Sequence, residues 1–190
     1  METIRLYDYE YKGCISCFAC KIKNSKTNGL CAYKDDLSPA LEKVHEADVV
    51  IVGSPVYYSY PTGQVRSFIE RWLFPVGTYV WENGAQKTIR DKVVPTGLIY
   101  TMNCPEDMMK ANNYPVILSD TAAAMGQIMG HNELLYIYNT YQFKDYSRYD
   151  QNLFDEEDKR RYREEHFETD IENAFQMGKR LVEAVKELNR

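Results

Sequence analysis

The sequence predicts an α/β fold in which a parallel sheet is covered by helices on both faces. Apolar, β-branched blocks alternate along the chain with segments whose apolar residues recur at helical spacing. The 190 residues suffice for one sizeable core, and no internal repeat or low-complexity linker divides them. We therefore expect residues 1–190 to form a single domain built on a doubly wound parallel sheet.

Four segments are predicted to form the strands. Residues 4–7 (IRLY) are a short β-prone run, and residues 48–53 (DVVIVG) are a continuous apolar block typical of a strand buried on both faces. Residues 93–101 (VVPTGLIYT) give the third strand, whose regular pairing should begin after Pro95 because proline has no N–H to donate. Residues 134–140 (LLYIYNT) give the fourth.

Helical spacing of apolar residues predicts helices between these strands. The first has Ser38 as its cap and Pro39 in its first turn, and the second begins behind Thr62. Residues 108–125 give a third, weaker helical pattern. Each helix is expected to cover the sheet with its apolar face.

A last helix is predicted at the C-terminus. Its apolar stripe begins at Ile171, and Thr169 with Glu172 forms a capping box at its start. The charged run at residues 155–163 (DEEDKRRYR) is interpreted as a solvated helix start.

The charge of the chain excludes some classes of partner. The formal net charge is −5, and no basic face compensates, which speaks against nucleic acid or an anionic membrane. The first residues lack the apolar core of a signal peptide, and about eighteen consecutive apolar residues occur nowhere. We therefore expect a cytoplasmic protein without a membrane or nucleic-acid partner.

Two loops follow predicted strands, at the edge where parallel sheets bind ligands. Residues 54–64 (SPVYYSYPTGQ) offer aromatic faces, backbone N–H groups and a helix N-terminus, which suit a flat, polar-edged ring or an anion. Residues 101–107 (TMNCPED) end the next strand. The alternative is that both are ordinary connections whose proline and glycine serve the turns.

The string GSPVYYSYPTGQVRSFIERW, following EADVVIV, resembles the second flavin-contacting loop of the flavodoxin-like NAD(P)H-dependent FMN reductases, a family of quinone and flavin oxidoreductases. The segments GCISCFACK and GLCAYKDDL resemble the cysteine-bearing branch of that family, which includes the iron–sulfur flavoproteins. The resemblance covers residues 2–104 well and the rest only in the order of elements. It implies a flavodoxin-like sheet.

The resemblance implies an FMN-dependent NAD(P)H oxidoreductase that passes hydride or electrons to a quinone, a flavin or a similar small acceptor. The cofactor does the chemistry, so no catalytic side chain is expected. The residues carried over to the flavin ring are Ser54, Pro55, Val56, Tyr57, Tyr58, Ser59, Thr101, Met102 and Asn103. A homodimer or higher homo-oligomer is also implied, with the tyrosines of residues 136–149 as interface anchors or as the lining of the chain's own cleft.

One departure from the family concerns its first strand and the Gly-Ser-type phosphate loop, which have no counterpart in this sequence. Relative to the family, the chain is therefore expected to be truncated at its N-terminus and to hold the FMN phosphate poorly. The vacant sheet position should be filled by upstream residues, by another subunit, or by residues 4–7 pairing with residues 49–52. A phosphate loop at residues 54–63 is a further alternative.

Four of the five cysteines, Cys14, Cys17, Cys20 and Cys31, lie within eighteen residues. We expect them to be reduced and free of metal, since the last spacing is long and no proline follows Cys31. A four-iron cluster or a zinc ion on these thiolates is the alternative. The other functions considered are therefore an iron–sulfur flavoprotein-type electron carrier and a degenerate, non-enzymatic binding module.

Overall fold

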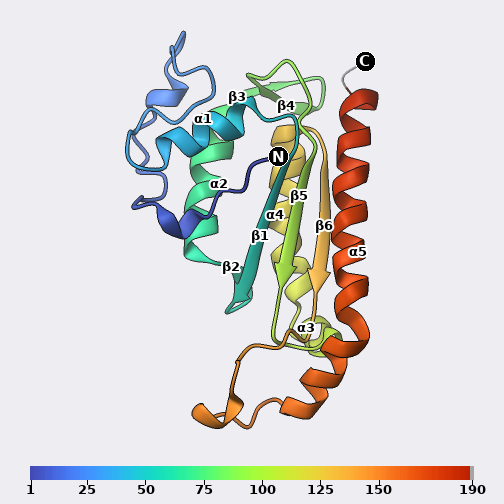
Figure 1. The fold of residues 1–190 in the computed structure, drawn as a ribbon. Helices are drawn as coiled ribbons and strands as arrows, with labels where there is room; N and C mark the ends of the chain where they lie inside the picture. Colours follow the sequence, from blue (N-terminus) through green and yellow to red (C-terminus); the bar gives the residue numbers. More distant parts are fainter. Residues whose placement is uncertain (189–190) are drawn as a thin grey trace.

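The computed structural model describes residues 1–188 and shows a parallel-dominated sheet between two layers of helices (Figure 1). The strand order is β2-β1-β5-β6, and β1, β5 and β6 run parallel. The short β2 is antiparallel to β1, and β3 and β4 form a separate hairpin. The strands are β1 (Val50–Tyr57), β2 (Tyr60–Pro61), β3 (Gly77–Glu82), β4 (Ala85–Thr88), β5 (Thr96–Thr101) and β6 (Asn132–Ile137).

The helices lie on both faces of this sheet, as predicted. Helices α2 and α4 pack on one face together with α1, and α5 packs against β5 and β6 on the other (Figure 1). The bounds are α1 (Ser38–Glu46), α2 (Gly63–Val76), α3 (Glu106–Ala111), α4 (Tyr114–Met129) and α5 (Glu156–Leu188). The architecture is consistent with a flavodoxin-like α/β fold.

Side chains of β1 alternate between the two layers. Val50, Val52 and Ser54 are buried toward α2 and α4, whereas Ile51 and Pro55 are exposed on the α5 side. This alternation follows from the two-residue period of a strand. Because α5 lies mainly over β5 and β6 and reaches β1 only near Gly178, Ile51 remains 44% exposed.

Three of the four predicted strands form. Pairing of the third begins at Thr96, directly after Pro95, as the missing proline N–H requires. The strand predicted at residues 4–7 is wrong: Leu6–Asp8 is a 3₁₀ turn, and Ile4 and Leu6 pack against the helical core. Packing against α2 covers their apolar side chains, so this segment buries apolar surface without pairing to a neighbouring strand.

One backbone edge of β1 stays open in the described residues. From Val50 to Pro55 this strand pairs with β5 on one side, while β2 joins its other side only at Val56 and Tyr57. Inward pairing of residues 4–7 with residues 49–52 is therefore not what the structure shows. An unpaired edge of this kind is a ready template for a further strand.

The helix predictions hold in part. Thr62 caps α2, since its Oγ1 accepts the N–H of Val65 at 3.3 Å. Leu37, rather than Ser38, occupies the cap position of α1, and Ser38 begins the helix. The segment predicted at residues 108–125 is two helices, α3 and α4, separated at Asn113, which has a left-handed φ of 58°.

The capping box predicted at Thr169 is wrong because α5 begins thirteen residues earlier and runs through it. Asp155 starts the helix: its Oδ1 accepts the N–H of Asp158 at 2.9 Å. The charged run that follows continues the helix through pairs such as Arg160 with Glu164.

A buried ion pair attaches the irregular N-terminal third to the helical layer. Arg71 of α2 is 1% exposed and pairs with Asp35. Its guanidinium also donates to the carbonyl oxygens of Tyr33 (2.7 Å) and Lys12 (3.3 Å). Asp35 in turn accepts the N–H of Leu37 at 3.1 Å, so the same carboxylate orients the start of α1.

Asp35→Ala should lower the free energy of unfolding by about 3–5 kcal/mol, because it leaves the buried Arg71 guanidinium without its carboxylate. Its exposed neighbour gives the matched control, and Asp36→Ala should change the free energy by less than about 0.5 kcal/mol. Urea unfolding followed by circular dichroism measures both. Equal losses in the two variants would show that the pair does not anchor this region.

Candidate functional site

The two segments predicted to meet a ligand lie side by side at the carboxyl edge of the sheet. In the β1–β5 ladder Ser54 stands opposite Tyr100, and Pro55 stands opposite Thr101. The chain continues from these pairs into Val56–Ser59 on one strand and Met102–Asn103 on the other. The structure thus brings the two backbone segments together, although the side chains of Ser54 and Met102 are buried in the core.

The first segment is more regular than a loop. Its first four residues belong to β1, and Tyr58 and Ser59 form the tight turn to β2 with left-handed φ values of 48° and 71°. Ser54 is buried, and its Oγ accepts the N–H of Thr62 at 3.0 Å, which ties the strand to the start of α2. Tyr58 is 97% exposed, so its ring is available to solvent or a ligand.

The second segment is held by its backbone. The N–H of Met102 donates to Ile137 O at 2.9 Å, and Met102 O accepts the N–H of Thr140 at 3.0 Å. The N–H of Asn139 donates to Cys104 O at 3.0 Å. Beside these bonds, Asn103 Oδ1 is buried and has no hydrogen-bond partner in the described part of the chain.

Lys159, in the first turn of α5, is a residue that the sequence analysis missed. The charged run around it was interpreted as solvated, yet Lys159 is 1% exposed. Its Nζ donates to Asn103 O at 2.6 Å and to Asn139 Oδ1 at 2.8 Å, and it lies 4.4 Å from the centre of the Phe154 ring. No sequence signal marks it, because its neighbours in the run are exposed charged residues.

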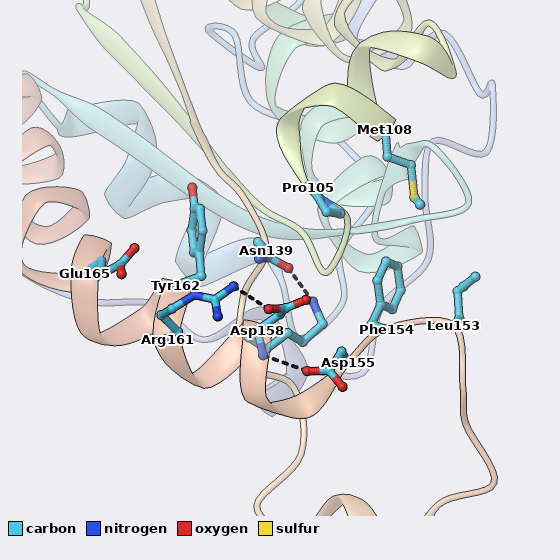
Figure 2. Close-up of a pocket in the computed structure, with 11 residues that line it drawn as sticks. Pro105, Met108, Asn139, Leu153, Phe154, Asp155, Asp158, Arg161, Tyr162 and Glu165 are labelled. Atoms are coloured by element: carbon cyan, nitrogen blue, oxygen red, sulfur yellow. Dashed lines mark hydrogen bonds and ion pairs between the residues drawn. The ribbon is translucent and has the colours of Figure 1, made fainter.

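A cleft of about 470 Å³ lies beside this lysine, at the end of the sheet where α3 and α5 begin. Figure 2 shows Leu153 and Phe154, from the segment before α5, on one side and Pro105 and Met108 on the other. Tyr162 and Glu165 of α5 extend the lining (Figure 2). The cleft therefore adjoins the second predicted segment at Pro105, and Lys159, which also lines it, bonds to Asn103 O.

Burial sets the protonation of the groups in this region. It lowers the pKa of Lys159 to about 8, since an ammonium group away from water loses its hydration. It raises the pKa of the Cys104 thiol and raises that of Tyr100 to about 12. At neutral pH the lysine is thus the charged member of this group, and the thiol and phenol are neutral.

An FMN ring fits these residues. A Cβ placed on Gly53 would meet nothing within 4 Å, and Pro55 and Tyr57 are exposed, so the end of β1 leaves room for a flat ring. The unpartnered Asn103 Oδ1 is an acceptor suited to a ring N–H. At the start of α2, Thr62 Oγ1 already accepts the N–H of Val65 at 3.3 Å.

The four clustered cysteines do not fit an iron–sulfur cluster as they are placed. Cys14 and Cys17 are exposed, and Cys20 and Cys31 are partly buried. Across residues 1–188, no group of three or more cysteine, histidine or acidic side chains is arranged to hold a metal ion. Burial raises the pKa of the Cys20 thiol. The loop itself is attached to α2 by Lys21, which donates to Phe74 O and Gly77 O.

Comparison with known proteins identifies the relatives of this chain. The family model for NADPH-dependent FMN reductase matches residues 1–102. An iron–sulfur flavoprotein of Archaeoglobus fulgidus is 43% identical over 70 residues, which cover 37% of this chain and 32% of that protein. One from Methanocaldococcus jannaschii is 39% identical over 70 residues, covering 37% and 34%. The chain thus matches about a third of the length of these relatives.

Among solved structures, the NAD(P)H:quinone oxidoreductase of Methanothermobacter marburgensis aligns with a TM-score of 0.45 and 13% identity, over 77% of this chain and 70% of that one. No helix within residues 1–188 is both long and apolar enough to cross a membrane.

The buried ammonium of Lys159 predicts a pH-dependent stability. Between pH 8 and 10.5 the unfolded chain keeps this proton while the folded chain has lost it, so folding becomes more favourable as pH rises. Relative to Lys159→Met, the wild-type free energy of unfolding should therefore rise from pH 7 to pH 10, by at most about 3 kcal/mol.

Urea unfolding at pH 7, 8, 9 and 10 measures this difference. The matched control is Lys179→Met, the same substitution at an exposed position of α5, which should follow the wild type at every pH. If the difference in free energy of unfolding between the wild type and Lys159→Met stays constant with pH, the pKa of the lysine is not lowered.

Proposed function

Because the chain belongs to the NADPH-dependent FMN reductase family, we propose that it is an FMN-dependent NAD(P)H oxidoreductase that reduces a quinone, a flavin or a similar small acceptor. The observation that carries the proposal is the register of β1 and β5, which sets Ser54–Ser59 beside Thr101–Asn103 at the carboxyl edge of the sheet. Open α/β sheets, which are not closed into a barrel, bind cofactors at this edge.

The bound FMN would supply hydride and electron transfer, and the residues of this chain would bind and orient it. Pro55 and Tyr57 present exposed surface on the end of β1 for one side of the ring. Asn103 follows the end of β5, where its amide would offer a hydrogen bond to the polar ring edge, whereas the Met102 side chain is buried in the core and could contribute through its backbone. No side chain is assigned a proton-transfer role.

A second candidate function is electron transfer by a flavin and an iron–sulfur cluster, which the names of the archaeal relatives favour. The spacing of Cys14, Cys17 and Cys20 is compatible with it. The placement of these cysteines argues against a cluster, because within residues 1–188 no three such side chains are arranged to hold a metal ion. A third candidate is a binding module that holds no flavin.

An absorbance spectrum of the purified protein, recorded with and without added FMN, separates these three functions. The proposed oxidoreductase should take up FMN, show flavin bands and be reduced by NADH or NADPH with loss of those bands. About four iron and four sulfide per chain after anaerobic purification would favour the electron carrier. A protein that stays colourless in excess FMN would overturn the proposal.

Titration of variants tests which residues meet the ring. Tyr58→Phe should leave the FMN dissociation constant within about tenfold of the wild type, because backbone contacts tolerate side-chain change. Pro55→Trp should weaken binding more, since its bulk occupies the space on the end of β1. The reverse order of effects would show that the ring lies elsewhere.

We also propose a homodimer or higher homo-oligomer. Tyr149 is half exposed and could serve as an anchor with its outer face, although its ring stacks on Phe143 with ring centres 4.0 Å apart. Tyr146 is buried, and Tyr136 stacks on Tyr100 of its own chain with ring centres 6.1 Å apart. The tyrosine-rich segment is thus mostly used within the subunit. Light scattering at micromolar concentration should return at least twice the mass of one chain, and a single-chain mass would contradict the proposal.

A further inference from the structure

Lys159 joins three segments that are far apart in the sequence. Its Nζ donates to the main chain after β5 at Asn103 O and to the side chain of Asn139 after β6. The Phe154 ring, from the segment before α5, lies 4.4 Å from the same nitrogen. One ammonium group therefore connects both loops at the carboxyl edge of the sheet to the start of the last helix.

This arrangement is costly for the fold. A buried ammonium without a carboxylate partner loses most of its hydration, and no acidic side chain in residues 1–188 lies within ion-pair distance of Lys159. The nearby Asp158 pairs with Arg161, and Asp155 caps the helix. A methionine would fill the same space without losing hydration, so what the lysine adds is its two charge-assisted hydrogen bonds.

Those two bonds act on the segment that follows β5. The ammonium of Lys159 donates to Asn103 O and to the side chain of Asn139. The backbone N–H of Asn139 in turn donates to Cys104 O. Thr140 completes the connection by donating its N–H to Met102 O. The backbone of residues 102–104 is thus held by a closed set of bonds in which Lys159 is the only charged donor.

We propose that Lys159 is a positioning residue for the flavin site: through its bonds to Asn103 and Asn139 it holds Met102 and Asn103 in the conformation that meets the ring. The inference rests on the proposed function. It concerns how the site is preorganised, since the lysine is 1% exposed and its ammonium is already bonded to both loops.

The charge on Lys159 makes this role dependent on pH. With a pKa of about 8 the ammonium loses its proton between pH 7 and pH 9, and its bonds to the two loops weaken. The groups around it are the Cys104 thiol, the phenols of Tyr138 and Tyr162, and the carboxylates of Asp155 and Asp158. Burial raises the pKa of Cys104, Tyr138 and Tyr162, which moves the titration of these three groups further above that of Lys159.

The test measures FMN affinity of the full chain by fluorescence titration at pH 7, 8 and 9. Lys159→Met should raise the dissociation constant about tenfold at pH 7 and leave it flat with pH, whereas in the wild type it should rise a few-fold toward pH 9. Lys179→Met, on the exposed face of α5, should follow the wild type. Equal affinity of Lys159→Met and the wild type would overturn the proposal.

A second variant keeps the lysine and changes only its partner. Asn139→Asp has the same shape and places a carboxylate oxygen at the 2.8 Å position of Asn139 Oδ1. It should raise the lysine pKa, so the fall in FMN affinity should move to a pH above 9. A merely structural lysine would not move this midpoint, and an unshifted profile would contradict the positioning role.

Amide hydrogen exchange of the flavin-free protein separates failure of this inference from failure of the proposed function. Lys159→Met should speed exchange at the amides of residues 102–104 and 139–140, with the rest of the sheet unchanged. If the wild type binds no FMN, the proposed function fails. If exchange in these two loops is as slow in Lys159→Met as in the wild type, the positioning role of Lys159 fails, whether or not FMN binds.

Discussion

Six consecutive residue pairs join β1 to β5 in parallel, from Val50 opposite Thr96 to Pro55 opposite Thr101, and the rest of the structure depends on this register. A shift by one residue would turn Val52 and Ser54 away from the helical core and turn Ile51 and Gly53 toward it. The same shift would separate the ends of the two strands. Core packing and site geometry are therefore determined by one set of ladder hydrogen bonds.

Two buried cations attach irregular segments to this frame. Arg71 projects from α2 and binds backbone carbonyls of the N-terminal region together with Asp35, so its charge is compensated. Lys159 projects from α5 and binds the loops after β5 and β6 without a carboxylate. The first arrangement serves stability, because breaking it leaves a bare charge. The buried Lys159 ammonium lowers the free energy of unfolding near neutral pH, and in the role proposed above it orders a segment of the flavin site.

Sequence patterns predicted those elements whose cause is local. The missing N–H of Pro95 and the hydroxyl of Thr62 act within a few residues, and both effects appear as predicted. Residues 4–7 form no strand because β propensity does not specify a partner, and α2 supplied a competing surface. The β3–β4 hairpin was not predicted, although Asn83-Gly84 is a strong turn signal and both residues have left-handed φ values. The positions of the ring-facing segments came from family resemblance, whereas Lys159 depends on tertiary burial that no local pattern reports.

The central claim is that the ends of β1 and β5 form a single flavin site, and backbone amide shifts recorded while FMN is added test it most directly. The account predicts that the shifted amides gather in both residues 54–59 and residues 101–103 and saturate with one dissociation constant. Shifts confined to one of these segments would contradict it. So would shifts centred on the groove of about 490 Å³ that α2, α4 and the β3–β4 hairpin form away from the strand ends.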